Sequence, residues 1–180
     1  MLELSLHILD IVNNSIKANA TEIEIEVNEQ VSKNLLSISI IDNGLGMDEN
    51  FLKTVTDPFK TTRTTRKVGM GLSMFKAAAE ATGGKLEIFS KKNVGTRVLA
   101  TFVYDHIDRQ PIGDMAETML TLVCGNEEID FIYRHIKDDK KFILETKQIK
   151  EILGSISFSE PDVALWLKDY VEEGLDELSF

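Results

Sequence analysis

Apolar and polar side chains recur with a helical period at the start of the chain. The apolar positions are Leu2, Leu6, Leu9, Val12 and Ile16. Their spacing of three or four residues predicts an amphipathic helix over residues 2–19. A polar stripe follows the same period at Glu3, His7, Asp10, Asn14 and Lys17. Because a buried polar group without a partner costs about 1–3 kcal/mol, this stripe either finds partners in a site or faces water.

Strict alternation of apolar and polar residues then predicts two strands. Isoleucine and valine alternate with glutamate in residues 21–28, and isoleucine and leucine alternate with serine in residues 35–41. The second strand leads into the sequence DNGLGM at positions 42–47. Asn43 and Gly44 could form a hairpin turn, but the helical pattern of the next residues disfavours a returning strand. A calcium loop starting at Asp42 is excluded because its third and fifth positions are glycines.

A second pair of glycines, Gly69 and Gly71, opens another predicted helix over residues 69–82. The pair follows a basic, threonine-rich run at positions 60–67. Free backbone N–H groups at the start of a helix attract phosphate, although a glycine before a helix is by itself a weak signal. Residues 86–89 and 98–103 are further predicted strands. The order of elements predicts an α+β fold, with a mixed, mostly antiparallel sheet and helices on one face.

The rest of the chain has a different pattern and a different charge. We expect a linker at residues 105–112, a hairpin of strands at 119–123 and 129–133, a strand at 142–144 and helices over 146–153 and from Glu160 onward. Residues 1–104 carry 12 acidic and 12 basic side chains, whereas residues 105–180 carry 18 and 8. We therefore predict a domain over residues 1–104 and a small, acidic α+β appendage over residues 105–180.

Composition excludes several classes of protein. The single cysteine, Cys124, rules out an internal disulfide and a cysteine-based metal cluster. No apolar run approaches the roughly 20 residues of a membrane span, and the first residues lack the basic region of a secretion signal. An acidic second part without a basic stripe disfavours nucleic acid as a partner. We expect a cytoplasmic protein that contacts neither nucleic acid nor a membrane.

Four segments together resemble motifs of one ATPase family. Residues 10–18 (DIVNNSIKA) are similar to an N box, residues 42–46 (DNGLG) to a first glycine box, residues 69–73 (GMGLS) to a second, and residues 95–98 (GTRV) to a glycine–threonine turn. In this order they resemble the GHKL family of gyrase, heat-shock chaperone, histidine kinases and MutL. The resemblance covers residues 1–104 and implies a Bergerat-type α/β sandwich.

The resemblance is closest to histidine kinases and anti-sigma-factor kinases. Phe59-Lys60-Thr61-Thr62-Arg63 before the second glycine box is similar to their phosphate lid. Lys17 stands where histidine kinases usually carry a basic residue, and where MutL and gyrase carry an acid. The resemblance thus implies a kinase-like protein that binds ATP with Mg²⁺.

The family assigns roles to individual positions of this sequence. Asn14 is expected to ligate Mg²⁺, Asp42 to accept a hydrogen bond from the adenine amino group, and Thr96 to support Asp42 through a water. Gly44 and Gly46 leave room for the base, and Gly69 and Gly71 for the phosphates. The candidate phosphate-binding cations are Lys17, Arg63, Arg66 and Lys67, each of which could instead be a solvated surface charge. Met47, Thr62, Met70 and Leu72 complete the expected nucleotide site.

Two departures from the family bear on catalysis. Asp10 stands where hydrolytic members carry glutamate, and a general base must come within about 3 Å of its water, so its shorter side chain implies slow hydrolysis or only a held water. Lys67 replaces an additional glycine of the histidine-kinase motif. We expect a stand-alone regulatory protein in signal transduction that hydrolyses ATP or phosphorylates a separate protein. The alternative is an ATP-gated protein-binding switch with negligible turnover.

Overall fold

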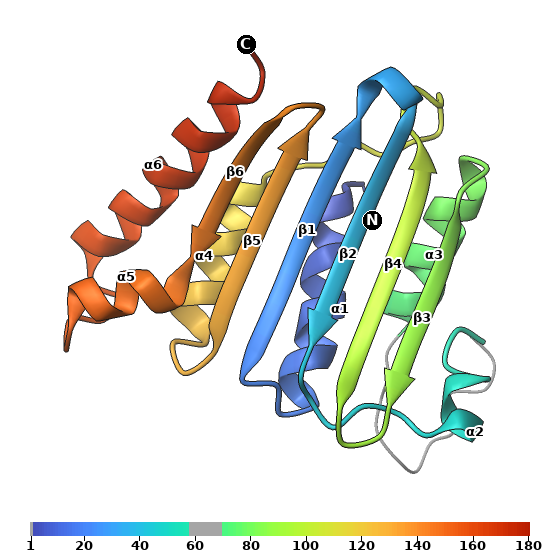
Figure 1. Cartoon of the computed structure of the whole chain (residues 1–180), viewed down its shortest axis with the longest axis horizontal. Coiled ribbons are helices and arrows are strands. Elements are labelled where there is room, and N and C mark those ends of the chain that lie inside the picture. Colours follow the sequence, from blue (N-terminus) through green and yellow to red (C-terminus); the bar gives the residue numbers. More distant parts are fainter. Residues whose placement is uncertain (1, 58–69) are drawn as a thin grey trace.

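One six-stranded sheet forms the centre of the computed structural model, which describes residues 2–57 and 70–180. The strand order is β3-β4-β2-β1-β5-β6, and helices α1, α3 and α4 lie together on one face (Figure 1). The strands are β1 (Glu22–Gln30), β2 (Leu35–Asp42), β3 (Lys85–Lys91), β4 (Gly95–Val103), β5 (Asp130–Lys137) and β6 (Lys140–Glu145). The helices are α1 (Leu4–Lys17), α2 (Glu49–Leu52), α3 (Gly71–Ala81), α4 (Met115–Gly125), α5 (Thr146–Leu153) and α6 (Pro161–Glu177), with a 3₁₀ turn η1 (Val31–Lys33).

The sheet is mixed and mostly antiparallel, as the sequence predicts. Strands β3, β4, β2 and β1 pair antiparallel in that order, β5 runs parallel to β1, and β6 returns antiparallel to β5. Alternation in β1 places Ile23, Ile25 and Val27 in the core and leaves the glutamates between them on the other face. The prediction of an α+β fold with helices on one face is confirmed.

The first turn of α1 is completed by a distant part of the chain. The N–H of Leu4 donates to the carbonyl oxygen of Pro111 at 2.9 Å, and the N–H of Ser5 donates to that of Ile112 at 2.7 Å. These bonds satisfy two of the donors that a helix leaves unpaired at its start. The expected linker therefore helps to hold the helix that carries the N box.

The hairpin predicted at residues 119–123 and 129–133 is wrong. Residues 119–123 belong to α4, which Asp114 caps by accepting a hydrogen bond from the N–H of Glu117 at 2.8 Å. Met115, Met119 and Leu122 recur at helical spacing and are buried, so tertiary packing overrides the strand preference of the threonine and valine residues. The hairpin lies between β5 and β6 instead, with a turn at Asp138, whose φ is +50°.

Residues 105–180 extend the sheet of the first part. β5 pairs with β1 along its length, from Glu22 opposite Asp130 to Glu29 opposite Lys137. At the far end of this pairing, the buried His135 contacts Glu29 through Nε2 and Oε1 at 2.7 Å. The two parts therefore share one sheet and one core, and independent folding of residues 1–104 stays a prediction.

Candidate functional site

A cavity of about 390 Å³ lies at the end of the sheet that contains Asp42, the last residue of β2. Its lining residues are Ile11, Asn14, Ser15, Lys17, Ala18, Asp42, Gly46, Met47, Phe51, Leu72, Thr96 and Val98. They come from α1, β2, the loop after β2, α2, α3 and β4. The volume falls within the range of about 300–1,000 Å³ that is usual for small-molecule sites.

The buried carboxylate of Asp42 is the polar centre of this cavity. The hydroxyl of Ser15 donates to Asp42 Oδ2 at 2.6 Å, and the N–H of Gly44 donates to Oδ1 at 2.9 Å. The Ser15 bond has the short length that is typical of a hydroxyl donating to a charged oxygen. Since each carboxylate oxygen can accept more than one hydrogen bond, Asp42 is held from two sides and retains capacity to accept a further donor from a ligand.

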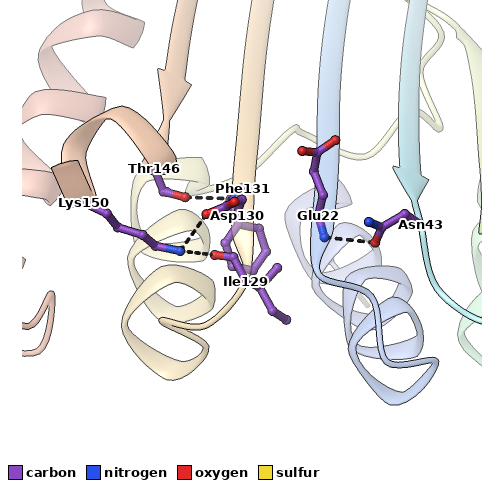
Figure 2. A network of polar contacts seen from close by, with 7 residues as sticks. All are labelled: Glu22, Asn43, Ile129, Asp130, Phe131, Thr146 and Lys150. Atoms are coloured by element: carbon purple, nitrogen blue, oxygen red, sulfur yellow. Dashed lines mark hydrogen bonds and ion pairs between the residues drawn. The ribbon is translucent and has the colours of Figure 1, made fainter.

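Asn43 fixes the backbone that follows this carboxylate. Figure 2 shows its side-chain oxygen accepting from the N–H of Glu22, at 3.0 Å. The same oxygen accepts from the N–H of Thr21 at 2.9 Å, and the amide nitrogen donates to the Thr21 hydroxyl at 2.9 Å. The end of β2 is therefore attached to the start of β1 by side-chain contacts as well as by strand pairing.

The same end of the sheet is attached to α5 through the start of β5. The N–H of Asp130 donates to the carbonyl oxygen of Thr21 at 2.9 Å. Lys150 of α5 donates to Asp130 Oδ1 at 2.9 Å, and the N–H of Phe131 donates to the hydroxyl of Thr146 at 2.8 Å (Figure 2). Polar contacts thus link the end of β2 with the starts of β1 and β5 at this end of the sheet.

Thr96 lines the cavity, and its hydroxyl is held by Ser90. The two hydroxyl oxygens are 2.8 Å apart. Ser90 Oγ also accepts from the N–H of Met47 at 2.8 Å, which ties the glycine-rich loop to β3. Thr96 is the register partner of Asp42, so the two polar side chains lie on neighbouring strands.

Glycine is required at two positions where the loop after β2 meets the β3–β4 turn. Gly46 has a φ of +64°, and a Cβ there would lie 2.1 Å from the carbonyl oxygen of Lys91. Gly95 has a φ of +143°, and its Cβ would lie 2.0 Å from the carbonyl oxygen of Asp42. Both positions combine a backbone conformation that favours glycine with backbone-to-backbone contact. The two glycines therefore allow the loop after β2 and the β3–β4 turn to pack backbone to backbone next to Asp42.

Asn14 and Lys17 present polar atoms to the cavity from α1. Among the described residues, the Asn14 side chain has no hydrogen-bond partner, and Lys17 has no ion-pair partner. An amide oxygen is a suitable ligand for Mg²⁺, which also keeps waters and phosphate oxygens as ligands. The donor set therefore fits a magnesium–phosphate group better than a metal held by protein alone, consistent with the absence of a metal-ligating cluster in residues 2–57 and 70–180.

Asp10 lies one helical turn from Asn14, next to the start of α3. A Cβ on Gly71 would lie 3.2 Å from the Cβ of Asp10 and 3.5 Å from its Oδ2. The carboxylate is exposed and has no hydrogen bond or ion pair with the described part of the chain. The second glycine box thus brings the helix start, where phosphate is favoured, against the candidate base.

The structure brings many of the sequence-predicted site residues together. Asn14, Lys17, Asp42, Gly46, Met47, Leu72 and Thr96 line the cavity. Gly44 lies behind Asp42, Gly71 lies against Asp10, and Met70 is 64% exposed at the start of α3. Thr62, Arg63, Arg66, Lys67 and Gly69 lie outside the described residues. Roles of all these positions in binding remain expectations.

Sequence analysis missed the residues that position Asp42 and Thr96. Ser15 is only 3% exposed, and a hydroxyl at a buried position of a helix was a signal that it needed a polar partner. Ser90 lies in a short strand with no motif around it, and its role follows only from the register of β3 and β4. Ile11, Ala18, Phe51 and Val98 add an apolar wall that suits a flat ring.

Comparison with known proteins agrees with this geometry. A family described as histidine kinase-, DNA gyrase B- and HSP90-like ATPases matches residues 2–106, which include all the elements that line the cavity. The chain belongs to this ATPase family. The match ends shortly after β4, so it does not cover α4 to α6.

Sensor kinases are among the proteins whose sequences are similar to part of this chain. The sensor histidine kinase YvrG of Bacillus subtilis is 31% identical over 100 residues, a match that covers 52% of this chain and 17% of that protein. The chain spans no more than 17% of the length of the curated relatives that it matches first. Each match therefore covers only a small part of the relative.

Two solved structures share the fold at low sequence identity. The N-terminal domain of a DNA repair protein superposes with a TM-score of 0.58 and 20% identity, covering 86% of this chain and 58% of that one. The MutL ATPase domain of Aquifex aeolicus, complexed with ADP, superposes with a TM-score of 0.50 and 17% identity, covering 98% of this chain and 70% of that one.

In the described ranges, no helix is both long and apolar enough to cross a bilayer.

Proposed function

We propose that this chain binds ATP with Mg²⁺ in the cavity around Asp42 and hydrolyses it or transfers its terminal phosphoryl group to a separate protein, in a signalling role. The buried Asp42 carboxylate, held by Ser15 and Gly44 inside an apolar cavity, is the observation that carries this proposal. When bound, the magnesium ion would neutralise charge on the phosphates.

Asp42 favours binding of adenine over guanine. A carboxylate only accepts hydrogen bonds, and the exocyclic amino group of adenine donates them, whereas guanine presents a carbonyl oxygen at the corresponding position. A buried site that is built for one partner rejects the other strongly because its polar group would be left unpaired. Thr96 supplies a hydroxyl next to Asp42 that can hold a water on the same edge of the base.

Asn14 and Lys17 would face the phosphate end of the ligand. The unpaired amide oxygen of Asn14 suits magnesium, and the ammonium group of Lys17 suits an anionic oxygen. Asp10 would accept the proton of an attacking water or hydroxyl, or orient it, from its place beside Gly71.

Phosphate release and protein labelling from ATP test the proposal. The purified chain is incubated with labelled ATP and Mg²⁺, with and without a cell extract that supplies acceptor proteins. Asp10→Asn should abolish phosphate release, whereas Asp139→Asn, which removes an exposed carboxylate from the β5–β6 turn, should leave it unchanged. Absence of ATP binding by the wild-type chain would overturn the proposal.

A second candidate function is an ATP-gated protein-binding switch with negligible turnover. The exposed carboxylate of Asp10 favours this candidate, because no described residue holds it in place. A catalytic base is usually oriented by a hydrogen bond to a neighbour. A switch needs only a difference in nucleotide affinity between two conformations. ATP binding without phosphate release or labelling, in both wild type and Asp10→Asn, would favour this candidate.

A further inference from the structure

The outer side of α6 carries large apolar residues that stay exposed. Leu165 is 60% exposed, Trp166 is 47% exposed and Tyr170 is 40% exposed. The helix is attached through its opposite side, where Leu167 and Val171 are fully buried. Large apolar residues that stay exposed on one side of a surface helix indicate an interaction site.

The aromatic part of this surface is held in a fixed geometry. Trp166 and Tyr170 stack with ring centroids 5.3 Å apart and an interplanar angle of 17°. Tyr170 in turn contacts Phe142 of β6, with centroids 5.5 Å apart. The helix lies so close to β6 that a Cβ on Gly174 would lie 2.1 Å from the Phe142 ring. The exposed rings are therefore preorganised, which lowers the entropy cost of binding a partner.

Acidic side chains surround the aromatic pair. Asp162, Asp169 and Glu173 lie three, four or seven residues from Trp166, so they flank it on the same side of the helix. All three are exposed, and none forms an ion pair with the described part of the chain. The single lysine of α6, Lys168, already pairs with Glu117 of α4 at 3.0 Å. We call Asp162, Leu165, Trp166, Asp169, Tyr170 and Glu173 the α6 surface.

We propose that the α6 surface docks a basic, amphipathic segment of a separate protein. Lysine or arginine side chains of such a segment would meet the carboxylates and stack over the exposed faces of Trp166 and Tyr170, while its apolar side chains would cover Leu165. The charge disfavours two other occupants. A second copy of the chain would bring carboxylates against carboxylates, and a membrane with anionic headgroups would meet the same repulsion.

This inference goes beyond ATP binding and does not depend on it. The α6 surface lies outside residues 2–106, the part that matches the ATPase family, and none of its residues lines the cavity. It gives the acidic C-terminal part the role of recruiting a partner protein.

A labelled peptide provides the test with the full chain. The probe is a fluorescein-labelled synthetic peptide with leucine and lysine at helical spacing, and its binding is followed by anisotropy. Trp166 is the only tryptophan of the chain, so its emission reports contact at the proposed place. We expect saturable binding with a shift of Trp166 emission to shorter wavelength. Saturation without any change in this emission would overturn the proposal.

Matched variants separate the α6 surface from the overall negative charge. The triple change Asp162→Asn, Asp169→Asn and Glu173→Gln should weaken peptide binding at least about tenfold. A control triple, Glu80→Gln, Asp108→Asn and Asp139→Asn, removes the same charge from exposed positions elsewhere and should change it less than about threefold. Equal weakening by both triples would contradict the proposal.

Two apolar changes complete the test. Trp166→Gln and Leu165→Ser should each weaken binding about fivefold or more, since truncating an anchor of an interface usually costs this much. Both positions are exposed, so circular dichroism should show unchanged folding. Wild-type affinity in both variants would refute docking on this surface. Self-association in sedimentation that Leu165→Ser abolishes would assign the surface to a second copy instead.

Discussion

Removing the hydroxyl of Ser15 is expected to weaken both the fold and nucleotide binding. Ser15→Ala deletes one of the two donors that hold the Asp42 carboxylate, at 2.6 Å and in a position only 3% exposed. A hydrogen bond to a charged group contributes about 1.5–3 kcal/mol, so the free energy of unfolding should fall by that amount. The carboxylate would then rotate more freely, and we expect the Kd for ATP to rise about tenfold, which corresponds to about 1.4 kcal/mol.

Ser5 offers a matched control on the same helix. It is 2% exposed, its hydroxyl donates to Glu3 at 3.2 Å, and it does not line the cavity. Urea unfolding measures the stability of both variants, and titration calorimetry with Mg-ATP measures their affinity. Ser5→Ala should leave the Kd unchanged. A Ser15→Ala variant that loses stability but binds ATP as tightly as wild type would show that Ser15 only supports the fold.

Two further predictions concern backbone conformation and pH. Gly46→Ala should destabilise the chain by about 1–3 kcal/mol in urea unfolding, more than Gly154→Ala, which has a similar φ of +61° but no atom within 4 Å of its Cβ. Burial lowers the pKa of His7, so the folded chain takes up this proton at a lower pH than the unfolded chain, whose value is the ordinary 6.5. Stability should therefore fall as the pH drops from 6.5, by up to about 1.4 kcal/mol at pH 5.5, and His7→Gln should remove this dependence.

Each of these predictions can fail in a specific way. Equal destabilisation by Gly46→Ala and Gly154→Ala would mean that the contact with the Lys91 carbonyl is easily relieved. A pH dependence between 6.5 and 5.5 that persists in His7→Gln would assign it to another group. Glu29 does not interfere in this range, because its pKa is lowered from 4.5 by its hydrogen bonds to His135 and Tyr104, against the effect of burial, and its contribution is lost only at lower pH.

Local pattern predicted the elements of the first part because each has a clear period. Alternation in β1 agrees with the structure. A helix forms at α1 as predicted, but its buried face is centred on Leu4, Ile8 and Ile11, whereas Leu6 of the predicted apolar stripe is 41% exposed. The C-terminal part was predicted less well, since pattern alone does not show which strands pair. The parallel pairing of β5 with β1 joins residues more than 100 positions apart, and the helix at Met115–Gly125 depends on packing against other helices.

Motifs located the cavity but not the contacts that shape it. Asp42 and Asn14 belong to recognisable segments and line the same cavity. Ser15 and Ser90 act through single hydroxyl groups whose partners come from other elements, so the sequence does not show which group each of them binds. The polar stripe on α1 also divides in the structure, because His7 is buried against Phe75 whereas Asp10 and Lys17 are exposed.

Calorimetric titration of wild type and Asp42→Asn with Mg-ATP and Mg-GTP tests the central claim most directly. Asparagine keeps the size of the side chain but replaces one acceptor oxygen with a donor, so it opposes the adenine amino group. The account predicts that wild type binds ATP and not GTP, and that Asp42→Asn loses ATP binding by at least about a hundredfold. Equal binding of both nucleotides by wild type, or unchanged ATP affinity in the variant, would contradict it.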